Sequence, residues 1–223
     1  MYNRGFSQQD VIKELSKKYK MRPSQKTISN WINEHKNICT FINLRNQAIK
    51  MFAPNEIIYE QVFDHNNLPY TFQVHRAKIR ILFNDGRYNN QFSTTSKFEK
   101  PLLEYLRKIP TKDFPHHIFQ RKEIAQEGLE RSSQLKFETL PFLKLEKNNL
   151  ANRLAGLALH LAKNNRERHS VIQNFMLIND SSTIAVEVPV YLTNDDILYF
   201  EKRGFDLPFK NIKTPITGHI DLL

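Results

Sequence analysis

Few side chains in this sequence are placed to do chemistry, and the best candidates lie in its last third. His160, Glu187 and Asp221 supply one imidazole and two carboxylates. Taken singly, a histidine beside an apolar face is usually structural, and an acid on a strand usually faces solvent. The adjacent His116 and His117 lack a spacing that completes a zinc site, and the glycines form no phosphate-binding loop. The interpretation therefore depends on the elements that position His160, Glu187 and Asp221.

Two predicted elements carry the first two of these residues. Residues 150–164 repeat leucine at helical spacing, which predicts an amphipathic helix with His160 at the edge of its apolar stripe. Residues 183–192 alternate as a half-buried strand, with Glu187 on the side opposite to an apolar row. That row consists of Ile184, Val186, Val188, Val190 and Leu192.

The third residue lies on a last predicted strand. After a loop over residues 193–213, residues 216–223 again alternate, and Asp221 shares a side with Thr217 and His219. We expect this strand to lie at an exposed edge of its sheet, where it could pair with another chain.

The order helix, strand, strand resembles the opening half of the PD-(D/E)XK nuclease superfamily, most closely its RecB-like branch. The segment "GLALH" (156–160) is similar to that branch's Gly-x-x-x-His helix motif. "VEVPVYL" (186–192) looks like its first core strand, and "ITGHIDLL" (216–223) like the strand that supplies the metal-binding aspartate. The resemblance covers residues 146–223 and implies a partial restriction-endonuclease-like α-β-β core.

The resemblance also implies a site. Asp221 would be a metal ligand, His160 an accessory ligand approaching it from a helix that covers the sheet, and Glu187 an assisting or surface-facing acid. Phosphodiester hydrolysis needs a divalent cation to neutralise charge at phosphorus and to lower the pKa of the attacking water. Mg²⁺, or Mn²⁺ in its place, is the expected ion, because such sites use carboxylate oxygens.

The family's next strand, which bears Asp/Glu-x-Lys, is not found among residues 1–223. The chain is therefore expected to be a fragment truncated before its catalytic strand, or a degenerate member of the family. In either case we expect weak metal binding and little activity from residues 1–223 alone.

The N-terminal stretch predicts a helix-turn-helix. Ser7 and Asp10 have the spacing of a capping box, and apolar residues at helical spacing follow. Pro23 ends this first helix, and Ser24 can cap a second one. The expected inward face of the second helix is Ile28, Trp31 and Ile32. Trp31 is therefore expected to be largely buried against the first helix.

The second helix offers candidate DNA contacts. Lys26, Asn30 and Asn33 project opposite its apolar stripe, and Ser29 lies on the flank. A cation and short polar side chains suit phosphates and base edges in a major groove. The segment is similar to the helix-turn-helix units of transposases and resolvases, although its turn is longer and lacks glycine. The alternative is an αα-hairpin used only for packing.

Charge and composition narrow the class of protein. The net charge is +10, of which residues 1–36 and 37–145 each carry +5 while residues 146–223 are neutral. A basic front half suits a polyanion such as DNA. The single cysteine, Cys39, excludes a disulfide framework. No apolar run approaches a membrane span or a secretory signal, so a cytoplasmic location and no membrane partner are expected.

Residues 37–145 are expected to be mainly helical. Polar and proline-containing breaks separate predicted helices near 41–52, 71–83, 97–108 and 120–130. The predicted fold class is thus α/β and mostly helical. Its domains are a helix-turn-helix (1–38), a helical connecting region (39–145) and a partial nuclease-like domain (146–223).

Two functions fit these patterns. The first is a Mg²⁺-dependent DNA endonuclease or exonuclease that its helix-turn-helix brings to the substrate. The second is a non-catalytic helix-turn-helix protein, either a regulator or the DNA-binding arm of a mobile-element recombinase. DNA is the expected partner in both, and the edge strand allows a homodimer.

Replacing Lys26 should lower DNA affinity for all sequences and flatten its salt dependence, because a phosphate contact releases counterions. Changing Asn30 or Asn33 should instead alter sequence preference. Fluorescence anisotropy of labelled duplexes over a salt series measures both effects. If removing residues 1–36 leaves affinity unchanged at moderate salt, the helix-turn-helix assignment is wrong.

Overall fold

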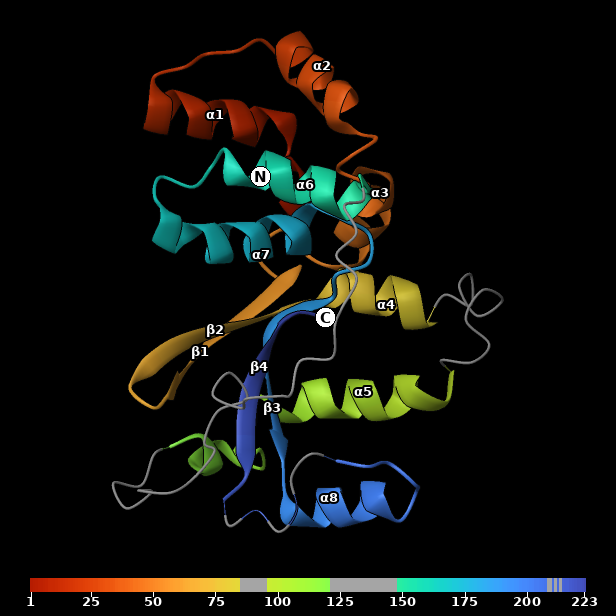
Figure 1. Ribbon diagram of the computed structural model, residues 1–223. Helices are drawn as coiled ribbons and strands as arrows, with labels where there is room; N and C mark the ends of the chain where they lie inside the picture. The colour runs from red at the N-terminus through yellow and green to blue at the C-terminus, as the bar shows by residue number, and fades with distance from the viewer. Residues whose placement is uncertain (85–95, 121–147, 208–209, 211, 213) are drawn as a thin grey trace.

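A four-stranded antiparallel sheet with the order β1-β2-β3-β4 organises the chain (Figure 1). The computed structural model describes residues 1–84, 96–120, 148–207, 210, 212 and 214–223. The strands are β1 (Ile58–His65), β2 (Leu68–His75), β3 (Ala185–Leu192) and β4 (Ile216–Leu222). The helices are α1 (Gln8–Tyr19), α2 (Gln25–His35), α3 (Ile42–Met51), α4 (Arg76–Asn84), α5 (Ser96–Lys108), α6 (Leu150–Leu159), α7 (Arg168–Asn179) and α8 (Asn194–Glu201). Short 3-10 turns are η1 (Tyr2–Arg4), η2 (His116–Phe119) and η4 (Asn165–Glu167).

The expectation of a mixed fold of helices and a sheet is confirmed. Among the described residues, no helix combines the length and the apolar character needed to cross a membrane.

The middle of the chain differs from its prediction by a β-hairpin. α3 and α5 match the helices expected at 41–52 and 97–108, but residues 71–83 divide between β2 and α4. β1 and β2 are joined by Asn66 and Asn67, whose φ angles of 59° and 60° are those of a two-residue hairpin turn. The middle region therefore supplies two of the four strands. Of the helix expected at 120–130, all but Gln120 lies outside the described residues.

Helices cover both faces of the sheet. On one face, α5 and η2 pack over a core that includes Phe63, Phe72 and Val188. On the other, residues of α3 and α7 surround a second core that includes Phe41 and Val186. α4 contributes apolar side chains to both cores. Any side chain on the sheet therefore has one of two environments, set by the face that it occupies.

α7 takes the position expected for the helix that carries His160. It packs on β3 and β4, while α6 packs on the outer side of α7 (Figure 1). Leu154 of α6 and Met176 of α7 share a small core with Cys39. α8 lies within residues 193–213, where a loop was expected, and begins with a capping box between Thr193 and Asp196. As expected, β4 lies at an edge of the sheet.

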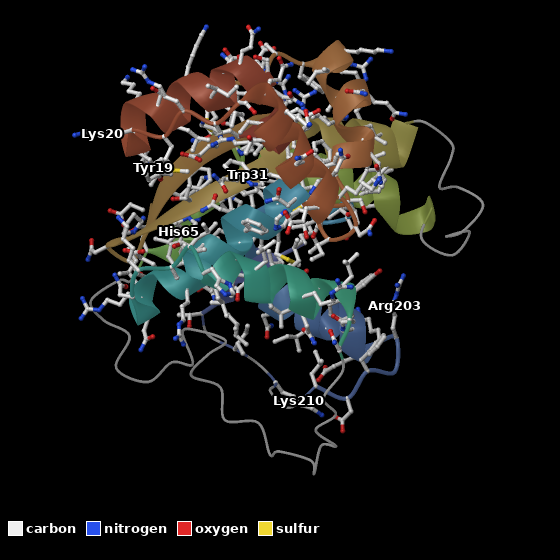
Figure 2. All side chains as sticks on the ribbon, turned by 90° about the horizontal axis from the view of Figure 1, so that it is seen from above. Tyr19, Lys20, Trp31, His65, Arg203 and Lys210 are labelled. Atoms are coloured by element: carbon white, nitrogen blue, oxygen red, sulfur yellow. The ribbon has the colours of Figure 1, made fainter. Side chains whose placement is uncertain are left out.

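The two N-terminal helices begin where the sequence predicts. Ser7 and Asp10 form the capping box of α1, and the Ser24 hydroxyl accepts from a backbone amide of α2. The predicted burial of Trp31 is wrong, because its exposed fraction is 40% (Figure 2). Ile28 is the buried residue of α2, and Trp31 is rotated from it by about 60° around the helix axis.

A buried lysine ties α4 to the turn between α7 and β3. The Lys78 ammonium donates to the Asp180 carboxylate at 3.0 Å, the Leu177 carbonyl at 2.6 Å and the Thr183 carbonyl at 3.0 Å. Burial lowers the pKa of Lys78 to about 8, against the opposing effect of Asp180. These contacts fix the C-terminal end of α7 and the start of β3.

Lys78 should make stability rise in mild alkali. Its pKa is about 8 in the folded chain and near 10.5 when unfolded, so between these values only the unfolded chain holds the proton. The free energy of unfolding should therefore increase by about 2 kcal/mol from pH 8 to pH 10. Urea unfolding over this range measures it. Lys78→Met should remove the increase, whereas the exposed Lys50→Met should keep it; equal slopes in both variants would contradict this account.

Candidate metal centre

Glu187 has an unusual backbone for a strand residue. Its φ is 51°, in the left-handed region that residues other than glycine rarely adopt. Val186 packs with Leu177 of α7, whereas Val188 packs with Phe63 in the core on the other face. Residues two apart on a regular strand share a face, so the alternation breaks at Glu187. The predicted single apolar row is therefore wrong, and Glu187 reaches α7.

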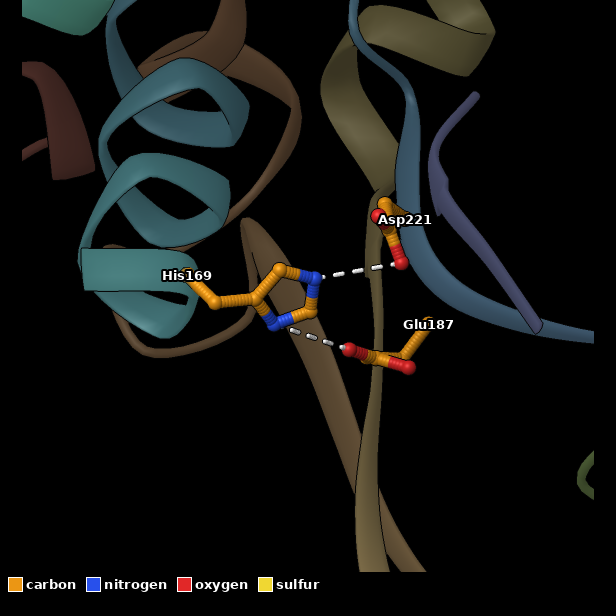
Figure 3. Close-up of side chains that lie close together, drawn as sticks. All are labelled: His169, Glu187 and Asp221. Carbon is orange, nitrogen blue, oxygen red and sulfur yellow. Dashed lines mark ion pairs between the residues drawn. The ribbon is translucent and has the colours of Figure 1, made fainter. Parts of the chain in front are cut away.

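His169, Glu187 and Asp221 converge beside the sheet (Figure 3). The His169 Nε2 lies 3.1 Å from Asp221 Oδ1, and its Nδ1 lies 3.7 Å from Glu187 Oε1. One ligand atom from each residue lies within 4.8 Å of the other two. Because Val186 pairs with Leu222 and Val188 with Ile220, the register sets Glu187 opposite Asp221. Two carboxylates at opposed positions repel each other unless a positive charge lies between them.

Gln173 orients the Glu187 carboxylate. This buried side chain lies one turn after His169 on α7, and its Nε2 donates to Glu187 Oε1 at 2.7 Å. The same amide nitrogen lies 3.2 Å from His169 Nε2. Exchanging the amide oxygen and nitrogen would set the oxygen against the carboxylate, so the orientation is fixed.

His169 Nε2 consequently faces two incompatible partners. If protonated, it donates to Asp221 but meets an amide hydrogen of Gln173; if unprotonated, it accepts from Gln173 but meets a carboxylate lone pair. With Nε2 unprotonated, a cation bound by this nitrogen and the two carboxylates would separate its lone pair from the Asp221 carboxylate and offset the repulsion between the two acids. The donor set of one imidazole and two carboxylates fits a transition ion such as Mn²⁺ better than Mg²⁺, which prefers oxygen alone.

The three residues lie where two hollows meet. They line a pocket of about 230 Å³ together with Tyr70 and His219. A second hollow of about 560 Å³ shares Tyr70, His169 and Glu187 and continues between α7 and the β1–β2 hairpin. The candidate centre is thus open on two sides.

A chain of histidines forms one wall of the smaller pocket. His219 Nε2 lies 2.8 Å from His65 Nδ1, and His65 Nε2 lies 3.1 Å from His116 Nδ1. His116 Nε2 is 2.9 Å from the Ile109 carbonyl, which can only accept. In neutral rings each Nε2 therefore donates to the next group in the order His219, His65, His116 and Ile109. The His219 ring also stacks on Tyr70, with centroids 3.7 Å apart.

The structure keeps Glu187 and Asp221 together, as expected, but places His160 outside their cluster. It brings Glu187 and Asp221 into contact with His169, which the sequence did not suggest. His160 lies exposed at the C-terminal end of α6, where its Nδ1 is 2.9 Å from the Gly156 carbonyl. His169 was missed because α7 was not recognised, although Val171, Ile172, Phe175 and Met176 recur at helical spacing.

The candidate DNA contacts on α2 differ in their surroundings. Lys26, Asn30 and Asn33 are exposed. Ser29 is half-buried, and its hydroxyl lies 3.1 Å from Nε2 and 3.2 Å from Oε1 of Gln8. Ser29 therefore joins α2 to α1, and the other three side chains remain open to a ligand.

No protein-family model, curated protein or solved structure matches the chain. The class of site therefore rests on its own geometry and chemistry.

His65 should make stability fall in acid. Burial, and then the charge of His116, lower its pKa to about 4, against 6.5 when unfolded. As pH drops below 6.5 the unfolded chain binds a proton that the folded chain does not, so the free energy of unfolding should fall by about 1 kcal/mol towards pH 5. His65→Gln should flatten this slope, measured by urea unfolding. The exposed His117→Gln is the control, and a slope that responds equally to both changes would refute the assignment.

Proposed function

We propose that this protein is a divalent-metal-dependent nuclease that hydrolyses phosphodiester bonds in DNA, with His169, Glu187 and Asp221 as its metal ligands. The observation that carries the proposal is the convergence of two opposed strand carboxylates on one imidazole at the junction of two hollows. The resemblance of residues 146–223 to the first half of a RecB-like PD-(D/E)XK core supports the same chemistry.

Each residue has a role that follows from its contacts. Glu187, Asp221 and His169 would hold the ion, and Gln173 keeps the Glu187 carboxylate in place through its 2.7 Å hydrogen bond. The ion would supply positive charge at the scissile phosphate and a water of lowered pKa. His65 orients His219 in the pocket wall through the 2.8 Å contact between their rings, and the buried His65 is neutral at pH 7 because its pKa is lowered to about 4.

DNA is the substrate that the rest of the chain favours. Residues 1–36 carry a charge of +5. Lys26, Asn30 and Asn33 lie exposed on α2, the helix that would enter the major groove, and Ser24 caps its N-terminus. In this proposal α2 holds the duplex and the C-terminal half of the chain acts on it.

Metal affinity is the sharpest test, because it does not depend on turnover. Titration calorimetry with Mn²⁺ should detect one site that binds Mn²⁺ more tightly than Mg²⁺. Asp221→Asn, Glu187→Gln and His169→Ala should each weaken Mn²⁺ binding about tenfold or more, since even the loss of an outer-shell partner costs that much. His160→Ala is the matched control and should change affinity less than about twofold.

Cleavage and DNA binding then separate the two candidate functions. Cleavage by residues 1–223 alone is expected to be weak, and whatever Mn²⁺-dependent cleavage of plasmid and single-stranded DNA is measured should disappear in Asp221→Asn, while anisotropy shows unchanged DNA binding. Full DNA binding with no Mn²⁺ site would instead identify a non-catalytic helix-turn-helix protein. If Mn²⁺ binding were lost in His160→Ala but not in His169→Ala, the metal ligand would be His160, as the sequence predicts, and not His169.

A further inference from the structure

A larger pocket of about 630 Å³ lies on the face of the sheet opposite to the candidate metal centre. Phe72 and Val74 of β2 contribute to it, whereas Thr71 and Gln73 line the hollow beside the centre. Within the part of the chain that the structure describes, the larger pocket shares no lining residue with either hollow at the candidate centre. The volume is within the range of small-molecule sites.

The floor of this pocket is apolar and its mouth is aromatic. Phe72 is fully buried, and Val74 and Leu106 are nearly so. Phe52 and Tyr59 line the same pocket, and the Tyr59 side chain remains 38% exposed. A flat apolar group could therefore contact the exposed Tyr59 ring at the mouth, above the buried apolar floor.

Three arginines surround the opening. Arg76 and Arg80 lie one turn apart on α4, and Arg107 comes from α5. All three are exposed, and no acidic side chain among the described residues lines the pocket. The Arg76 guanidinium lies 4.7 Å from the Phe52 ring centroid, and its Nη1 is 3.5 Å from the Glu56 carbonyl. The opening thus gathers positive charge above an apolar floor.

We propose that this pocket binds an unpaired nucleotide of a single-stranded nucleic acid. The base would lie on the apolar floor against the ring of Phe52 or Tyr59, and consecutive phosphates would contact Arg76, Arg80 and Arg107. An acyl chain with a single acid group leaves most of this charge unmatched, and inorganic phosphate leaves the floor empty. Arginine suits phosphate through its planar fork, and aromatic rings stack on any base. Paired bases are stacked inside a duplex and cannot enter.

The test uses a fluorescent residue placed at the mouth of the pocket. Trp31 is the only tryptophan and is exposed, so Trp31→Phe gives a dark background into which Tyr59→Trp introduces one indole. A short oligodeoxythymidylate should quench this indole in a saturable manner, because a base stacks on it. The indole reports on this pocket alone, so binding at α2 does not contribute.

Charge removal then shows whether the arginines hold the phosphates. Arg76→Gln with Arg80→Gln should lower the affinity measured by quenching about tenfold and reduce the salt slope by about 1.4. Lys202→Gln with Arg203→Gln removes the same charge outside the pocket, and Arg203 likewise lies over a ring, 4.3 Å from the Tyr199 centroid (Figure 2). This control should change affinity less than about twofold.

Three results would overturn the proposal. The first is oligonucleotide binding, seen by anisotropy, that leaves the indole unchanged. The second is quenching by the complementary duplex as strong as that by the single strand. The third is saturation of the indole signal by decanoate or inorganic phosphate, with no response to the oligonucleotide.

Discussion

The left-handed backbone at Glu187 is the constraint on which the candidate centre and both cores depend. A regular strand would keep Val186 and Val188 on one face and direct Glu187 away from α7, towards the core that contains Phe63. Burying a carboxylate there without a partner would cost several kcal/mol. The left-handed conformation costs about 1–3 kcal/mol. The less costly arrangement therefore brings the acid to Gln173 and His169.

The sheet consequently separates charges of opposite sign. Glu187 and Asp221 lie on the side of the sheet that α7 covers, where His169 contacts both carboxylates. The other face presents arginines of α4 and α5 above an apolar floor. Cations and anions are thus attracted to different sides of the same four strands. The proposed metal ion and the proposed polyanion would therefore occupy different sites and would not compete.

How far the sequence predicts this structure depends on the range of the interactions involved. Capping by Ser7 and Ser24 and the strands that carry Glu187 and Asp221 follow from local patterns. The β1–β2 hairpin was missed because Asn66 and Asn67 were interpreted as a break, although asparagine tolerates the positive φ that such a turn requires. Periodicity could also have revealed α7. The kink at Glu187 and the replacement of His160 by His169 follow only from tertiary packing, which no local pattern encodes.

The seam between β2 and β3 consists of two residue pairs, Gln73 with Val186 and Val74 with Ala185. These pairs close a loop of about a hundred residues. The outer strand pairs, β1 with β2 and β3 with β4, join strands that are closer along the chain. The entropy of closing that loop must be overcome before the seam contributes any stability. The β1–β2 hairpin can therefore form early, on a microsecond scale, while the halves of the sheet join late. Until they join, both inner strands are open edges, and the folding chain is most vulnerable to pairing with its neighbours at that stage.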